Sequence, residues 1–134
     1  MEDYTGVGYL EIVDFDEDGK LLVNTEGRPA VVKVFSSQCG HCVAFHPEFQ
    51  KFASNTQSSV ATYVVQVDGV KESERAIGQH LNEFFPDFRG FPSVYLYING
   101  RVVSEFNENR TARALGEWIN QTMGREQVDL GVLQ

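Results

Sequence analysis

The stretch AVVKVFSSQCGHCVAFHPEFQKF, residues 30–52, decides the fold. Its first six residues are apolar apart from Lys33, which predicts a strand buried on both faces of a sheet. Cys39 and Cys42 follow, and the apolar residues behind them have the spacing of one helix face: Phe45, Phe49 and Phe52. A buried strand leading into a helix that opens on Cys-x-x-Cys is the context typical of a redox-active cysteine pair.

Strands and helices alternate along the rest of the chain. The sequence predicts strands at 9–13, 60–67, 93–98 and 101–106, a short extended piece at 21–23, and helices at 72–85 and 111–123. Asn99-Gly100 is a strong hairpin signal, so the last two strands are expected to pair antiparallel. The order predicts an α/β fold, a mixed sheet of four to five strands with helices on both faces.

Length and composition fit one globular domain of 134 residues. We expect a single domain at 9–124, an acidic arm at 1–8 before it and a tail at 125–134 after it. The net charge of −8 repels phosphate groups, so neither nucleic acid nor an anionic membrane surface is expected as a partner. No apolar run approaches the roughly 20 residues that span a bilayer. We expect a monomer.

Cys39 and Cys42 are the only cysteines, and residues 1–4 do not resemble a secretory signal. We therefore expect a cytoplasmic protein, unless a leader has been trimmed, and in a reducing compartment Cys-x-x-Cys is a redox motif or half of a metal site. A zinc site would need His46 and His80 as further ligands, and these lie in separate predicted helices. The redox motif is the favoured interpretation.

Four separated motifs resemble the thioredoxin superfamily, and most of all the catalytic domain of protein disulfide isomerases. Cys39-Gly40-His41-Cys42 is similar to that subfamily's active-site tetrapeptide. Pro47 stands where the family kinks the helix, and residues 47–53 resemble its Pro-Glu-x-x-x-x-Ala stretch. Arg89-Gly90-Phe91-Pro92 is similar to the Arg-Gly-Tyr-Pro that contains the family's cis-proline. The acidic lead-in also resembles thioredoxin-like proteins of large DNA viruses, which would make the source viral.

The resemblance implies exchange of thiols and disulfides on proteins, with no cofactor beyond the dithiol and with a reductase or oxidase that recycles it. Cys39 is expected to be the nucleophile, because a helix N-terminus stabilises a thiolate. Cys42 then resolves the mixed disulfide, His41 tunes the pair, and Gly40 completes the tetrapeptide.

Residues distant from the tetrapeptide are assigned by the same resemblance. Phe91 and a cis Pro92 are expected to hold the substrate backbone, with Gln38 at the edge of the site. Arg89 resembles an arginine that lowers the pKa of the second cysteine during oxidation.

Four departures from the family pattern bear on this assignment. Gln38 stands where the family has tryptophan, Val43 where it has lysine, and the short segment before residue 30 predicts a reduced first helix. Lys33 stands where members bury a carboxylate thought to accept the proton of the second cysteine. Strand alternation places Lys33 on the same face as Val31 and Phe35, pointing inward or with its amine snorkelling to solvent. If it points inward, a charged lysine would stabilise the Cys42 thiolate without acting as a base. A non-enzymatic adaptor that keeps the fold as a binding surface is the alternative.

Overall fold

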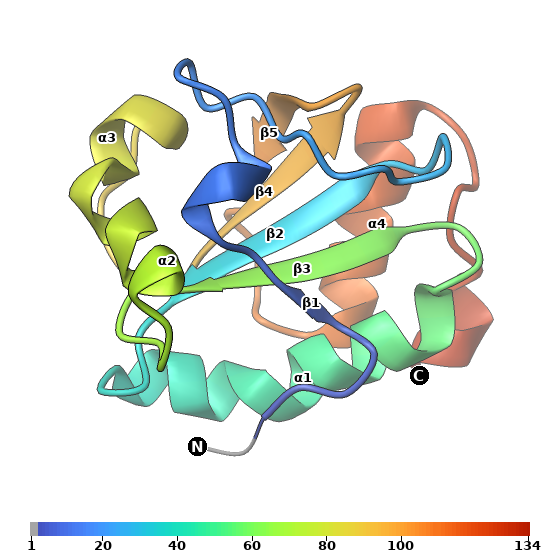
Figure 1. Ribbon diagram of the computed structural model, residues 1–134. Helices are drawn as coiled ribbons and strands as arrows, with labels where there is room; N and C mark the ends of the chain where they lie inside the picture. Colours follow the sequence, from blue (N-terminus) through green and yellow to red (C-terminus); the bar gives the residue numbers. More distant parts are fainter. Residues whose placement is uncertain (1–2) are drawn as a thin grey trace.

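A computed structural model describes residues 3–134 as one mixed sheet between two layers of helices (Figure 1). The strand order is β1-β3-β2-β4-β5. β3 pairs parallel with β1 and β2, and β4 pairs antiparallel with β2 and β5. The strands are β1 (Gly8–Tyr9), β2 (Ala30–Phe35), β3 (Ala61–Gln66), β4 (Ser93–Ile98) and β5 (Arg101–Glu105). The α/β architecture predicted from the sequence is confirmed.

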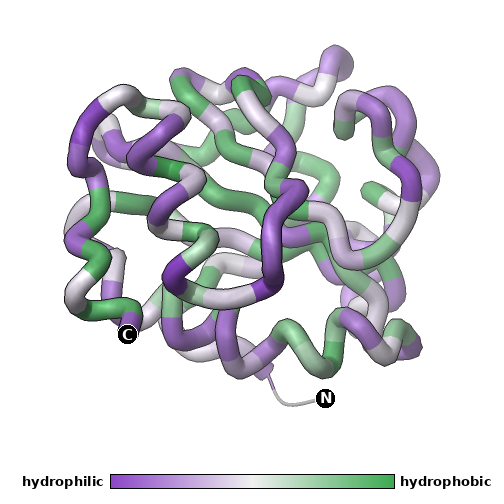
Figure 2. The backbone as a smooth tube through the Cα atoms, turned by 180° about the vertical axis from the view of Figure 1, so that it is seen from behind, coloured by the Kyte–Doolittle hydropathy of each residue, from purple (hydrophilic) through white to green (hydrophobic). Residues whose placement is uncertain are grey.

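The central strand β2 is buried along its whole length because it has a neighbour on each side and a helical layer on each face. Its alternate side chains serve two cores. Val31 and Phe35 pack in one, Val32 and Val34 in the other. Lys33 lies between Val31 and Phe35 in the alternation, so it points into the first core. Figure 2 shows these apolar strands running through the middle of the molecule with hydrophilic loops around them.

The first core is covered by α1 (Gly40–Thr56) and α4 (Ala112–Met123), which contact each other as well as the sheet. The Glu48 carboxylate of α1 accepts a hydrogen bond of 2.9 Å from the Ala112 amide at the start of α4. An acceptor there satisfies one of the unpaired amides of the helix N-terminus. Within residues 3–134, no helix is both long enough and apolar enough to cross a membrane.

The opposite face is covered by short elements rather than by the continuous helix predicted at 72–85. The structure has α2 (Glu72–Arg75), a 3-10 helix (Ala76–Gln79) and α3 (Leu81–Phe84). His80, at φ −127° and ψ 20°, separates the last two pieces. Ile77 and Phe84 are buried, because the short turns still present their apolar residues to the sheet.

The segment before β2 confirms the reduced first helix. Its ordered pieces are a 3-10 helix at Ile12–Asp14 and an isolated bridge between Phe15 and Leu21. The strand predicted at 9–13 is therefore wrong beyond Tyr9. Glu11 and Asp14 cap the 3-10 turn with their side chains, which favours a turn over extended backbone at that point.

Both terminal segments pack against the domain, in contrast to the arm and tail expected from the sequence. Tyr4 is buried in the first core, although residues 1–2 lie outside the described residues. At the other end, the Asn120 side chain of α4 bonds Gln127 and Val128, which turns the chain back. Leu133 is then buried beside α4. Apolar burial outweighs the ordering of these short ends.

Candidate active site

Cys39 is the N-cap of α1, as the sequence predicted. Its sulfur accepts a hydrogen bond of 3.2 Å from the Cys42 amide, one of the unpaired donors of the first helical turn. The Cys39 side chain is partly exposed. A sulfur that accepts from the helix N-terminus and still reaches solvent is placed to react as a thiolate.

Cys42 lies one turn further along α1 and is buried, with no exposed surface. Burial, together with the hydrogen bond and charge of Cys39, raises the pKa of the Cys42 thiol to about 12. The positive charge of Lys33 acts in the opposite direction. Cys42 is therefore a thiol at neutral pH, and its ionisation depends on what lies beside it.

The Phe91–Pro92 peptide bond is cis, which confirms the sequence prediction. It brings the Phe91 carbonyl to 3.6 Å from the Cys39 sulfur, close enough for the thiol to donate to it. Both residues are only half-buried. The turn before β4 thus places accessible backbone directly beside the reactive sulfur.

Lys33 is fully buried behind the cysteines, so of the inward and snorkelling placements that strand alternation left open, the structure has the inward one. Its ammonium lies 5.0 to 5.5 Å from the centres of four rings: Tyr4, Phe35, Phe45 and Phe49. Such positions attract a cation to the face of a ring. Nζ donates to the Tyr4 hydroxyl and, at 3.4 Å, to the Cys42 carbonyl. No salt bridge within residues 3–134 involves Lys33.

A carboxylate that sequence reasoning missed fixes the loop before Cys39. Asp68, at the end of β3, accepts hydrogen bonds from both the amide and the hydroxyl of Ser37. Burial raises the pKa of Asp68, but the bonds from Ser37 outweigh it and lower the value overall. In the sequence, Asp68-Gly69 indicates only the end of a strand. The separation between Asp68 and Ser37 along the chain does not predict their contact.

The sequence that builds this site matches a known protein family. The family model described as Thioredoxin matches residues 12–121, most of the chain. The chain belongs to the thioredoxin family. Its two cysteines stand at the Cys-x-x-Cys spacing at the start of α1.

Relatives of this thioredoxin-family chain include a viral protein and disulfide isomerases. It is 28% identical over 130 residues to the thioredoxin-like protein 453L of Invertebrate iridescent virus 6, covering 88% of this chain and 93% of that protein. It is 29% identical over 96 residues to protein disulfide isomerase-like 1-1 of Arabidopsis thaliana, covering 70% of this chain but only 18% of that protein. The match to the isomerase is thus to one part of a much longer protein.

Solved structures show the same fold. The Trx4 domain of ERdj5 superposes with a TM-score of 0.61 at 20% identity, covering 88% of this chain and 96% of that domain. Thioredoxin f from spinach chloroplast gives a TM-score of 0.61 at 20% identity, covering 92% of this chain and 99% of that one. The predicted thioredoxin fold is confirmed.

The other predicted site residues of this thioredoxin-family domain are exposed. Gln38, Gly40 and His41 surround Cys39 on the surface at the start of α1. Arg89 is exposed in the loop before the cis peptide. Its positive charge favours a lower pKa of Tyr95, a residue of the second core. The roles of these four residues stay predictions.

The histidines of the zinc alternative do not join the cysteines in a metal site. His46 stacks on the Tyr4 ring with centroids 4.0 Å apart, and His80 lies beside Glu83 and Phe84 on the opposite layer. Within the described part of the chain, no three histidine, cysteine or acidic side chains cluster closely enough to hold a metal ion. The donor set present beside Cys39 and Cys42 does not fit zinc.

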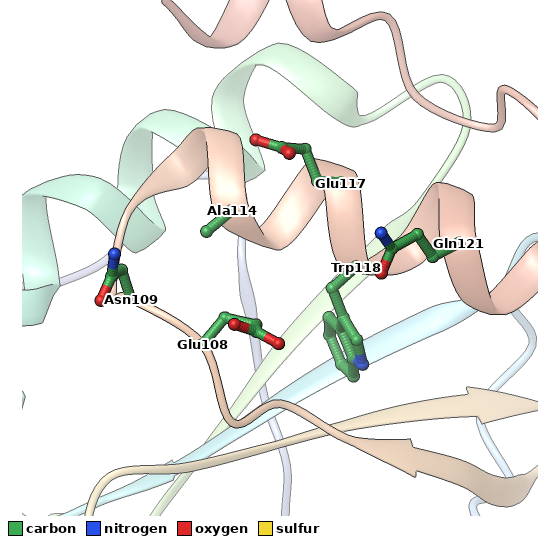
Figure 3. Close-up of a pocket in the computed structure, with 6 residues that line it drawn as sticks. All are labelled: Glu108, Asn109, Ala114, Glu117, Trp118 and Gln121. Carbon is green, nitrogen blue, oxygen red and sulfur yellow. The ribbon is translucent and has the colours of Figure 1, made fainter.

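A groove begins at Pro92 and follows the loop between β5 and α4. A second hollow shares Glu108 and Asn109 with it and reaches the surface of α4 (Figure 3). In Figure 3, Glu108 and Asn109 come from the loop, while Glu117 and Trp118 come from the helix. The surface beside the cis peptide is therefore hollowed toward the loop that precedes α4.

Proposed function

We propose that this domain is a thiol–disulfide oxidoreductase acting on protein disulfides through Cys39 and Cys42. The observation that carries the proposal is the position of the Cys39 sulfur between the Cys42 amide and the Phe91 carbonyl. One neighbour stabilises negative charge on sulfur, and the other belongs to a half-buried backbone beside which a substrate chain can lie.

Reduction of a substrate follows from these positions. The Cys39 thiolate attacks one sulfur of a substrate disulfide, the substrate S–S bond breaks, the other substrate sulfur leaves as a thiolate, and a mixed disulfide with Cys39 forms. The Cys42 thiolate then attacks the Cys39 sulfur, the Cys39–substrate bond breaks, the Cys39–Cys42 bond forms, and the remaining substrate sulfur leaves with the electron pair. Cys42 is shielded from solvent, so it reacts within the protein rather than with outside molecules.

The proposal includes partners of two kinds. One is a protein with thiols or disulfides whose extended segment lies along Phe91 and the groove at Pro92. The other is a reductase or oxidase that restores the dithiol after each turnover, because the domain itself holds only one electron pair. We propose a cytoplasmic, monomeric protein that works without a bound cofactor.

Insulin reduction tests the proposal against the adaptor alternative. With dithiothreitol as the reductant, the domain is expected to accelerate precipitation of the insulin chains with multiple turnovers per molecule. A matched sample alkylated at both cysteines should behave as the uncatalysed reaction. An untreated domain that gives only the uncatalysed rate would exclude the oxidoreductase and favour an adaptor.

His41→Pro is expected to lower the reduction potential of the dithiol. His41 is exposed in the first turn of α1, where proline is tolerated and where the Cys42 amide bond to Cys39 is kept. The change removes an imidazole whose positive form stabilises the thiolate. Thioredoxin and protein disulfide isomerase differ by about 90 mV, and we expect a good part of that difference.

Equilibration with glutathione buffers measures the shift in reduction potential of His41→Pro. The fraction of protein in the disulfide form is read by mass spectrometry after an acid quench. His80→Asn serves as the control, because His80 lies on the opposite helical layer and should leave the potential unchanged. An unchanged or higher potential for His41→Pro would show that His41 does not tune the pair.

A further inference from the structure

The N-terminal segment reaches the redox site through Tyr4. Thr5 and Gln50 exchange two hydrogen bonds, of 2.7 and 2.8 Å, which fix the segment on α1. The Tyr4 amide donates to the Tyr9 hydroxyl of β1. With its backbone held at both sides, the Tyr4 ring packs between His46 and Phe49. Its hydroxyl then accepts a hydrogen bond from the Lys33 ammonium.

Lys33 is consequently held between two oxygens, the Tyr4 hydroxyl and the Cys42 carbonyl. The four surrounding rings exclude water and supply no proton acceptor of their own. The mechanism above leaves one requirement open, since the buried Cys42 thiol has to lose a proton before it attacks. When Cys39 is bonded to the substrate in the mixed disulfide, Lys33 remains as a titratable group in contact with Cys42.

We propose that Tyr4 is a positioning residue that holds the Lys33 amine beside Cys42, and that this amine accepts the proton of the resolving thiol. The inference rests on the proposed function and adds to it a proton acceptor and the residue that orients it. It replaces the expectation from sequence that resolution proceeds without a buried base.

The charges facing Lys33 support a group that exchanges protons near neutral pH. Burial and the charge of Arg110, in the loop before α4, lower the pKa of Lys33 to about 8, against the opposing influence of Cys42 and Cys39. Tyr4 is itself a weak acid whose pKa burial raises, so it accepts from Lys33 without giving up its own proton. The sequence-based expectation assumed that Lys33 is permanently charged. Burial destabilises the charged form, so the amine can be neutral near pH 8.

Proton transfer from Cys42 to Lys33 precedes the exchange of disulfide bonds. The neutral Lys33 amine takes the proton from the Cys42 thiol and becomes an ammonium ion. The Cys42 thiolate attacks the Cys39 sulfur, the Cys39–substrate S–S bond breaks, and the substrate sulfur leaves with the electron pair as a thiolate. The ammonium then returns its proton to the departing thiolate or to water, which restores the neutral amine.

Release of a chromophoric thiol measures this step directly. A mixed disulfide between Cys39 and the chromophoric thiol is made at acid pH, and release is followed after a jump to a series of higher pH values. The native rate is expected to rise and level off near pH 8. Lys33→Met should lose that plateau and slow release about 100-fold at pH 8, the order expected for loss of a general base.

Tyr4→Phe keeps the ring and removes only the hydroxyl. Because that hydroxyl accepts from the ammonium, its loss is expected to move the midpoint of the release profile about one pH unit downward. The NMR signal of the ¹³C-labelled lysine ε-carbon, assigned by its absence in Lys33→Met, should move by the same amount. Tyr63→Phe is the matched control, because Tyr63 packs in the second core and should change neither midpoint.

Different outcomes overturn different claims. A Lys33→Met protein that keeps the native release profile would exclude Lys33 as the acceptor. A Tyr4→Phe protein with both midpoints unchanged would exclude Tyr4 as its positioning residue. The lysine signal is read without turnover, so a native protein that titrates as expected but releases no thiol would overturn the proposed function instead.

Discussion

Cys39→Ser is expected to abolish insulin reduction, whereas Cys42→Ser is expected to trap substrate. A serine hydroxyl does not form the mixed disulfide, so the first variant should fall to the uncatalysed rate. The second variant keeps the partly exposed sulfur that attacks and loses the buried one that resolves. It should accumulate a covalent adduct with an insulin chain, seen by mass spectrometry under non-reducing conditions.

Alkylation gives an independent measure of the same asymmetry. With the Cys42 pKa raised to about 12, roughly one Cys42 thiol in 100,000 is ionised at pH 7. The Cys39 side chain is partly exposed and therefore accessible to the reagent. Iodoacetamide at or below pH 7 should label Cys39 first. Equal labelling of the two thiols, or an adduct on Cys39→Ser in place of Cys42→Ser, would reverse the assigned roles.

Lys33→Met is expected to raise the free energy of unfolding of the disulfide form at pH 7. A buried charge without an acidic partner costs stability, and methionine keeps the apolar stem. The fall in pKa from 10.5 to about 8 corresponds to about 3 kcal/mol. Loss of the bond to Tyr4 returns about 1 kcal/mol, which leaves a net gain of about 2 kcal/mol.

The gain should depend on pH with a definite sign. Between pH 8 and 10.5 the unfolded chain keeps the Lys33 proton that the folded protein has lost, so native stability rises with pH there. Lys33→Met lacks this rise. Its advantage should shrink by about 2 kcal/mol between pH 7 and about pH 9.5. Urea unfolding of both oxidised proteins measures it, because the thiols do not titrate in the disulfide form.

The same variant is expected to have a lower reduction potential and a higher Cys42 pKa. The Lys33 ammonium attracts the Cys39 thiolate, which exists only in the reduced protein, and its positive charge also lowers the pKa of Cys42. A difference in stability that does not vary with pH, or a potential equal to the native one, would mean that Lys33 is neutral or solvated at pH 7.

Short-range patterns predicted the redox centre well. The alternation of β2 placed Lys33 on the core face, the Cys-x-x-Cys context placed Cys39 at the start of α1, and the Arg-Gly-Phe-Pro motif marked the cis peptide. Each of these depends on neighbours within a few residues. The sequence therefore carries them without knowledge of the tertiary structure.

The missed features depend on contacts between distant segments. Tyr4 lies in an acidic stretch whose apolar residues show no periodicity. It is buried because side chains of α1 and β2 pack around its ring. Asp68 meets Ser37 only because β3 pairs with β2. The helix predicted at 72–85 breaks around Gly78, which packs beside Val67 and has a low helix propensity. An apolar pattern alone does not distinguish one helix from three turns.

The position of the single tryptophan determines what fluorescence can report. Trp118 lies on α4, buried against Phe106, and its indole donates a 2.9 Å hydrogen bond to the Ser104 hydroxyl of β5. Gln38 occupies the place beside Cys39 where a second indole would be quenched by the disulfide. Emission from this protein therefore follows the docking of α4 on the sheet, so one indole reports unfolding without a second fluorophore beside the redox pair.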